Sequence, residues 1–200
     1  LQEEAIFPVR EANIPIQIKN TNRPSDAGTV IRETADGDVS EHLITGIAGR
    51  KDFTAIHIKK AHMSNEVGVI SRALHIVERY GVSVEHIPTG VDSFGIVVNA
   101  ADVRDTIYSI IADIRHEIEP DDITMVDRLA LVSVVGRNMS KRSGTSGKIF
   151  GALGEANINI RMITQSSEEI SIIVGVDNAD FDRTISVIYE RFVRDEMVLR

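Results

Sequence analysis

Two short loops, each leading into an expected helix, carry the residues of this sequence that are best suited to hold a ligand. The first spans residues 61–68, where Gly68 would let a ligand approach the backbone closely. The second spans residues 143–148 and is rich in Gly and Ser. Free N–H groups at a helix N-terminus can bind a carboxylate. Both loops are therefore candidate anion sites, although a simple N-cap by Ser146 explains the second loop equally well.

The second loop resembles a nucleotide-binding phosphate loop only superficially. That motif requires a Gly five positions before Gly147, where this chain has Arg142. It also requires Ser or Thr directly after Lys148, where this chain has Ile149. We therefore exclude a phosphate loop.

The first loop and the strand expected after its helix offer the groups that a free α-amino acid needs. Backbone amides near Gly68 would bind the carboxylate, and Glu85 or Asp92 would bind the ammonium group. Met63 and Ile70 would form apolar walls. The pattern alone nevertheless favours the simpler interpretation, in which Glu85 is a solvated strand residue.

Other chemistry finds no support in the sequence. No nucleophile and base form a recognisable signature, so we expect no catalytic residues. The histidines lack the spacing of a zinc-protease helix, and scattered packing or surface positions explain them better than a metal site. These six histidines are His42, His57, His62, His75, His86 and His116.

Composition excludes several classes of protein. The chain has 200 residues, 42% hydrophobic and 26% charged, which is typical of globular domains. A net charge of −8 argues against nucleic-acid and anionic-membrane partners. The absence of Cys excludes disulfides and thiolate metal sites. With no apolar run of about 18 residues and an acidic start, the sequence indicates a cytoplasmic protein. Its lack of an initiating Met suggests a piece of a longer chain.

An internal repeat organises the chain after residue 50. Phe94, Ile96 and Val98 alternate as in a half-buried strand, and Asp102 then precedes apolar residues at helical spacing. The same pattern recurs 78 residues later, over 172–192. Upstream, Gly68 matches Gly147 at a spacing of 79, and residues 82–87 match 158–163 at 76. The first helix of the first copy should therefore be about one turn longer.

Each copy is expected to form a strand, a loop, a helix, two strands and a second helix, and residues 122–126 would add a fourth strand to the first copy. This βαββαβ order predicts an α+β fold of two ferredoxin-like domains, 53–127 and 128–200. We expect two separate antiparallel sheets with helices on one face. The other face would favour oligomerisation. A single continuous sheet, or different topologies in the two copies, would contradict this interpretation.

The first fifty residues follow a different pattern. They predict a short helix over 5–13, a strand over 14–18, a loop over 20–29 and a polar, acidic linker over 34–42. Residues 43–48 should form a strand that has no obvious partner in this region.

Three segments together resemble the aspartokinase family. Residues 5–31, with FPVR at 7–10 and NTN at 20–22, resemble the end of its catalytic domain. Residues 156–163 (ANINIRMI) are similar to its ACT-domain signature. Residues 83–92 (SVEHIPTGVD) resemble its lysine-responsive branch.

This resemblance implies a parent kinase that uses ATP and Mg to phosphorylate the β-carboxylate of aspartate. Residues 1–33 would end its catalytic domain, and 43–48 would complete the second ACT domain. The fragment itself would be inactive and without cofactor. The ACT domains would pair in a homodimer or a larger homo-oligomer and bind lysine, with threonine as the alternative, for feedback inhibition. The effector site would comprise Met63, Glu66, Gly68, Ile70, Ser83, Val84, Glu85 and Asp92, and a possible second site Ser146, Gly147, Asn157 and Ile158.

Three alternatives remain. The chain could be a freestanding ACT-type amino-acid sensor. It could be an enzyme similar to acylphosphatase, although the loop over 61–68 has Asn65 and lacks the Arg residue that such a loop needs. An RNA-recognition module would need aromatic residues on its central strands, where this chain has aliphatic and acidic ones.

Overall fold

The computed structural model describes residues 3–32 and 43–194, and the chain divides into two compact units, residues 1–41 and 42–200. The first unit contains α1 (Glu3–Glu11) and a two-stranded antiparallel sheet of β1 (Ile16–Ile18) and β2 (Thr29–Ile31). The expected helix and first strand are present with slightly different ends. Strand β2 was missed because the Gly and Asn residues before it favour a loop. The predicted linker over 34–42 lies outside the described residues.

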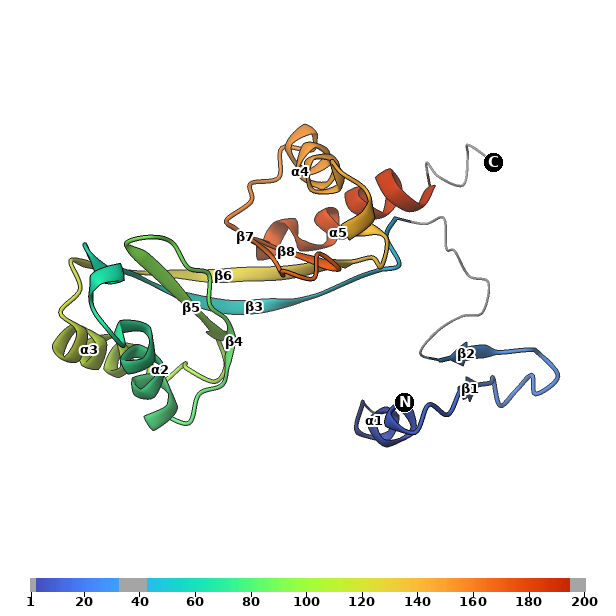
Figure 1. Cartoon of the computed structure of the whole chain (residues 1–200), viewed down its shortest axis with the longest axis horizontal. Coiled ribbons are helices and arrows are strands. Elements are labelled where there is room, and N and C mark those ends of the chain that lie inside the picture. The colour runs from blue at the N-terminus through green and yellow to red at the C-terminus, as the bar shows by residue number, and fades with distance from the viewer. Residues whose placement is uncertain (1–2, 33–42, 195–200) are drawn as a thin grey trace. The chain divides into compact units, whose positions relative to one another are not determined.

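The second unit alternates strands and helices along the chain (Figure 1). Its elements are β3 (Gly46–Lys59), η1 (Met63–Asn65), α2 (Val69–Arg79), β4 (Val84–His86), β5 (Ser93–Asn99), α3 (Ile107–Ile118), β6 (Asp122–Val135), η2 (Met139–Lys141), α4 (Thr145–Glu155), β7 (Met162–Gln165), β8 (Ser171–Asp177), η3 (Asn178–Asp180), α5 (Phe181–Tyr189) and the π-helical turn η4 (Glu190–Arg194).

Its six strands form one antiparallel sheet in the order β4-β5-β3-β6-β8-β7. Strands β3 and β6, each of 14 residues, pair along nearly their whole length. We call the part built from 53–59, β4, β5 and 122–126 the first half. The part built from 129–135, β7, β8 and 46–50 is the second half. Both halves have the same strand order, in which the first strand lies between the third and the fourth. The ferredoxin-like βαββαβ topology is therefore confirmed.

The expectation of two separate sheets was wrong. The fourth strand of the second half, 46–50, continues directly into the first strand of the first half. Likewise, the fourth strand of the first half continues into the first strand of the second within β6. The sheet stays continuous because no Gly or Pro turn separates these pairs of segments. The two halves nevertheless share one topology, so the repeat still describes two equivalent units.

Each of the two long strands contains a bulge near its middle. The β3–β6 register shifts between Arg50 and Phe53 and shifts back between Phe53 and Ala55. Asp52 and Arg128 adopt positive φ angles of 69° and 54° at these points. A bulge inverts which side chains face a given side of the sheet. In β3 the core-facing positions accordingly change from odd (Ile47) to even (Ile56, Ile58).

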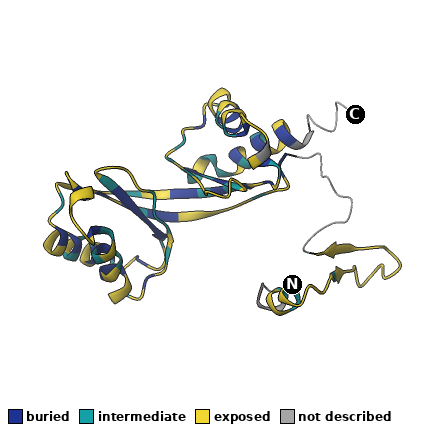
Figure 2. Ribbon diagram, viewed as in Figure 1, coloured by how far each residue is buried: buried dark blue, intermediate teal, exposed yellow. Residues whose placement is uncertain are grey.

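Each half has its own hydrophobic core between its sheet and its helices. Buried residues gather along the sheet and on one side of each helix (Figure 2). The first core includes Ile56, Ala73, Ile76, Ile96 and Ile110, and the second includes Val132, Ile149, Leu153, Val174 and Ile188. Helices α2 and α3 lie on one outer side of the unit, and α4 and α5 lie on the other (Figure 1).

A third, smaller cluster joins the faces of the two halves that no helix covers. Phe53 and Val97 come from the first half and Leu129 from the second, and all three are buried. Leu131 and Met162 pack against them from the second half. The bulges therefore bend the shared strands so that the two uncovered faces contact each other.

Three local expectations need correction. Helices α2 and α4 both have 11 residues and start at 69 and 145, which are 76 apart, so the first is not longer. Gly68 corresponds to Gly144, with φ angles of 82° and 84°, and not to Gly147. The second loop contains two Gly residues, and the apolar pattern did not distinguish them. Asp102 is no N-cap, because residues 100–106 form turns and α3 starts at Ile107.

Replacing Phe53 with Ala should destabilise the second unit by about 3–5 kcal/mol, because the lost phenyl ring leaves a cavity where the two halves meet. Urea unfolding of both proteins would measure this difference. Tyr108→Ala is the matched control, since Tyr108 is 75% exposed on α3, and should change stability by less than about 0.5 kcal/mol. Equal effects of the two substitutions would contradict the role of the third cluster.

Candidate functional site

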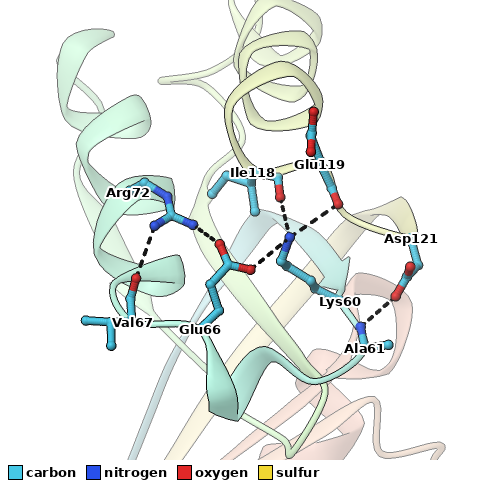
Figure 3. Close-up of polar contacts among 8 residues, drawn as sticks. All are labelled: Lys60, Ala61, Glu66, Val67, Arg72, Ile118, Glu119 and Asp121. Carbon is cyan, nitrogen blue, oxygen red and sulfur yellow. Dashed lines mark hydrogen bonds and ion pairs between the residues drawn. The ribbon is translucent and has the colours of Figure 1, made fainter.

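A network of charged groups fixes the loop over 61–68 (Figure 3). The ammonium group of Lys60, which directly follows β3, donates hydrogen bonds to the carbonyl oxygens of Ile118 at 2.7 Å and Glu119 at 3.4 Å. These carbonyls close the C-terminal end of α3, where a positive charge is favourable. Lys60 Nζ also lies 3.1 Å from the Glu66 carboxylate. Strand β3 is thereby tied to both the loop and α3.

Glu66 is the centre of this network. It also forms an ion pair with Arg72 of α2, and Arg72 donates a second bond to the carbonyl oxygen of Val67 at 3.1 Å. Hydrogen bonds from Lys60 and then Arg72 lower the pKa of Glu66 below its ordinary value. The carboxylate of Glu66 thus serves two cations of its own chain, which positions the loop.

A groove of about 1000 Å³ lies between α2 and the edge strand β4. Four of the eight predicted effector residues line it: Ile70, Ser83, Val84 and Glu85. The other four lie outside its lining. Met63 is buried in the first core, Glu66 is engaged as described, Gly68 is the N-cap of α2, and the backbone carbonyl of Asp92 accepts a hydrogen bond from Lys60 N.

Sequence reasoning missed much of the helical wall of this groove. Ser71, Leu74, His75 and Glu78 of α2 line it together with Ile70. They follow one another at helical spacing, so the 3.6-residue period of α2 could have identified them once Ile70 was placed there. Residues 81–87 form the opposite wall.

The two ends of the groove differ in electrostatic character. The first turn of α2 has no side-chain cap, so its N–H groups present a partial positive charge. Further along, Glu78 and Glu85 contribute carboxylates, and the lining contains neither Lys nor Arg. Such a groove can hold a carboxylate at one end and an ammonium group at the other.

Strand β4 also contacts the second half. Glu85 Oε1 lies 3.4 Å from Arg50 Nη1 of β3. His86 Nε2 lies 2.6 Å from Thr164 Oγ1 of β7. Burial lowers the pKa of His86, which favours its neutral form. The strand that forms one wall of the groove is therefore attached to both halves.

The second half differs at the corresponding positions. At the spacing of 76, the predicted second-site residues Ser146, Gly147, Asn157 and Ile158 match Ile70, Ser71, Gly81 and Val82, all of which line the first groove. The Ser146 hydroxyl donates to Gln165 Oε1 of β7 at 3.2 Å. This bond bridges the helix and the edge strand, where the first half has the apolar Ile70.

Within 3–32 and 43–194, no three His, Cys, Asp or Glu side chains lie together as metal ligands would. No helix in these ranges is both long and apolar enough to span a bilayer.

Comparison with known proteins identifies the class of this fold. Residues 132–192, within the second half, match the family model of the ACT domain. The first half repeats the same topology. The chain thus carries an ACT domain in a tandem ferredoxin-like arrangement.

Aspartokinase 3 of Bacillus subtilis is 37% identical to this chain over 191 residues, which are 95% of this chain and 42% of that protein. The crystal structure of Clostridium acetobutylicum aspartate kinase matches with a TM-score of 0.86 and 47% identity, covering 96% of this chain and 44% of that one. The chain is a regulatory ACT region homologous to those of the aspartokinases. It spans less than half the length of these relatives.

A more distant structure, E. coli aspartokinase III in complex with lysine and aspartate, has a TM-score of 0.75 and 21% identity. The match covers 96% of this chain and 42% of that one. At this identity the likeness concerns the fold alone.

Replacing Glu66 with Gln should remove both ion pairs and destabilise the loop over 61–68. Because folding lowers the pKa of Glu66, its contribution to stability is present above its ordinary pKa and is lost as the pH falls through the lowered value. The free energy of unfolding of wild type and variant should therefore differ at neutral pH and converge in acid.

The matched control is Glu78→Gln on α2, which does not enter this network and should show no such pH-dependent difference. A Glu66→Gln difference that persists unchanged into acid would contradict the ion-pair role.

Proposed function

We propose that this chain is the allosteric regulatory region of an aspartate kinase and that the groove between α2 and β4 binds lysine as the feedback inhibitor. One observation carries the proposal: the groove joins an uncapped helix N-terminus to two carboxylates and has no Lys or Arg in its lining. Aspartate phosphorylation, with ATP and Mg, belongs to the parent enzyme. Residues 1–33 would end its catalytic domain, and 34–42 would connect that domain to the ACT region.

Lysine satisfies this groove better than threonine or methionine. Its α-carboxylate would accept hydrogen bonds from the N–H groups of the first turn of α2. Its two ammonium groups would pair with Glu78 and Glu85, and its methylene chain would lie on Leu74. Threonine and methionine carry one ammonium group each, so each can pair with only one of the two carboxylates.

Regulation would act through a homodimer. Among the described strands, β4 and β7 are the two edges of the sheet, and an edge strand can pair with another chain. The apolar side chains of Val67 and Val91, in the loops around η1 and before β5, are 93% and 78% exposed. A second chain placed at β4 would cover the groove. A difference in lysine affinity between two dimer arrangements would then shift their populations, with a typical coupling of about 1–3 kcal/mol.

Calorimetric titration of the chain with lysine, threonine and methionine tests the proposal. Lysine should bind most tightly. Glu78→Gln and Glu85→Gln should each weaken lysine binding by about tenfold, because each removes one charge-assisted contact. Asp92→Asn is the control for a predicted residue outside the groove and should leave the affinity unchanged. Absence of heat with all three amino acids, or equal effects of all three substitutions, would contradict the assignment.

A further inference from the structure

A second cavity lies on the opposite side of β4, between the uncovered faces of the two halves. It has a volume of about 300 Å³, at the lower end of the range for small-molecule sites. Leu131, Ser133 and Ile173 of the second half line it. Glu85 and His86 of β4 line it from the first half. The cavity exists because the bulges bend the shared strands, which brings the uncovered faces of the two halves toward each other.

One wall of this cavity carries two opposite charges. The guanidinium group of Arg50 lies 5.3 Å from the centre of the Phe53 ring and 3.4 Å from Glu85 Oε1. The Arg50 side chain is 60% exposed, and a single long contact of this kind is weak. Both groups therefore keep most of their hydrogen-bonding capacity for a ligand.

The remaining lining is apolar except for one hydroxyl group. Leu131 and Ile173 offer aliphatic surface beside the Phe53 ring. The Ser133 hydroxyl forms no hydrogen bond to any residue of the described ranges. A small ligand here would meet a cation, an anion, an aliphatic surface and one free hydroxyl.

We propose that this cavity binds a small aliphatic α-amino acid. Its carboxylate would pair with Arg50, its ammonium group with Glu85, and its side chain would contact Leu131 and Ile173. A zwitterion suits the site because it supplies a partner to both members of the Arg50–Glu85 pair. A carboxylic acid without an amino group would draw Arg50 away from Glu85. An amine without a carboxylate would draw Glu85 away from Arg50. A ligand here does not require lysine in the α2–β4 groove, although both ligands would use the Glu85 carboxylate.

The two sites share one wall but differ in their other charged residues, and this difference makes them separable by substitution. Glu85 lines both the cavity and the groove, whereas Arg50 lines only the cavity and Glu78 only the groove. Arg50→Gln should therefore weaken ligand binding in the cavity alone, and Glu78→Gln should weaken it in the groove alone. Glu85→Gln should weaken ligand binding at both sites.

Titration of the isotopically labelled chain with L-valine, followed by backbone amide NMR, tests the proposal. The amides of Gly49, Leu131 and Ser133 should shift with a dissociation constant on the order of 1 mM. Arg50→Gln should weaken binding by about tenfold, because the carboxylate loses its charged donor. Lys51→Gln is the matched control, since Lys51 is a neighbouring cation that pairs with Asp182 and lies over the ring of Phe181, outside the cavity. Isovalerate and isobutylamine, which each lack one charge of valine, should bind at least about tenfold more weakly.

The proposal is overturned if valine shifts none of these amides or shifts only those of α2. It is also overturned if Arg50→Gln and Lys51→Gln behave alike, or if isovalerate binds as tightly as valine. Repeating the titration in Glu78→Gln separates the two sites: valine binding that persists there, together with weakened lysine binding, supports both proposals independently.

Discussion

The pairing of β3 with β6 is the constraint on which the rest of this molecule depends. Each strand serves both halves, so the backbone hydrogen bonds that complete one half of the sheet continue directly into the other half. The halves cannot separate as tethered domains do, because the same two strands would have to break. Where the strands bulge, Asp52 is held by Asn178, whose side-chain amide donates to Asp52 Oδ1 at 2.6 Å while Asp52 N donates back to Asn178 Oδ1 at 3.1 Å. The bend between the halves is therefore a supported feature of the fold.

Within this shared frame the two loop-to-helix junctions have diverged in charge. The first contains Lys60, Glu66 and Arg72, which pair with one another, and the neighbouring groove has an acidic lining. At the equivalent positions the second contains Gly136, Arg142 and Lys148, so the same backbone carries cations and no acid. In the second half, the Ser146–Gln165 hydrogen bond crosses between α4 and β7, where the first half has its groove between α2 and β4. One topology thus supports a ligand groove in the first half and a bridged, basic junction in the second.

The repeat and its element order were predictable because side-chain alternation and helical spacing are local properties. Continuity of the strands was not predictable, since whether 46–50 and 53–59 form one strand depends on partners in β6 that lie 63 to 89 residues away in sequence. The bulges were equally hidden: Asp and Arg, not Gly, occupy the positive-φ positions at 52 and 128. The ion pairs of Glu66 with Lys60 and Arg72 were not predictable, because only the folded loop brings the three side chains together. The helical wall of the groove at Leu74 and Glu78, in contrast, could have been predicted from the helical spacing of these residues.

Strand β4 is the element through which a ligand can influence both halves. It has only three residues, it lies at an edge of the sheet, and its pairing with β5 shifts between Val84 and His86. Two contacts hold it to the second half, the Glu85–Arg50 pair and the His86–Thr164 contact. Because Arg50 is largely exposed, the pair is worth at most about 1 kcal/mol, and a hydrogen bond of a neutral histidine contributes about 0.5–1.5 kcal/mol. Their sum is comparable to a typical allosteric coupling of about 1–3 kcal/mol. A ligand that redirects Glu85 alone would therefore change a substantial part of the free energy that holds β4 against the second half. Because β4 is short and lies at the edge of the sheet, few other contacts oppose its displacement.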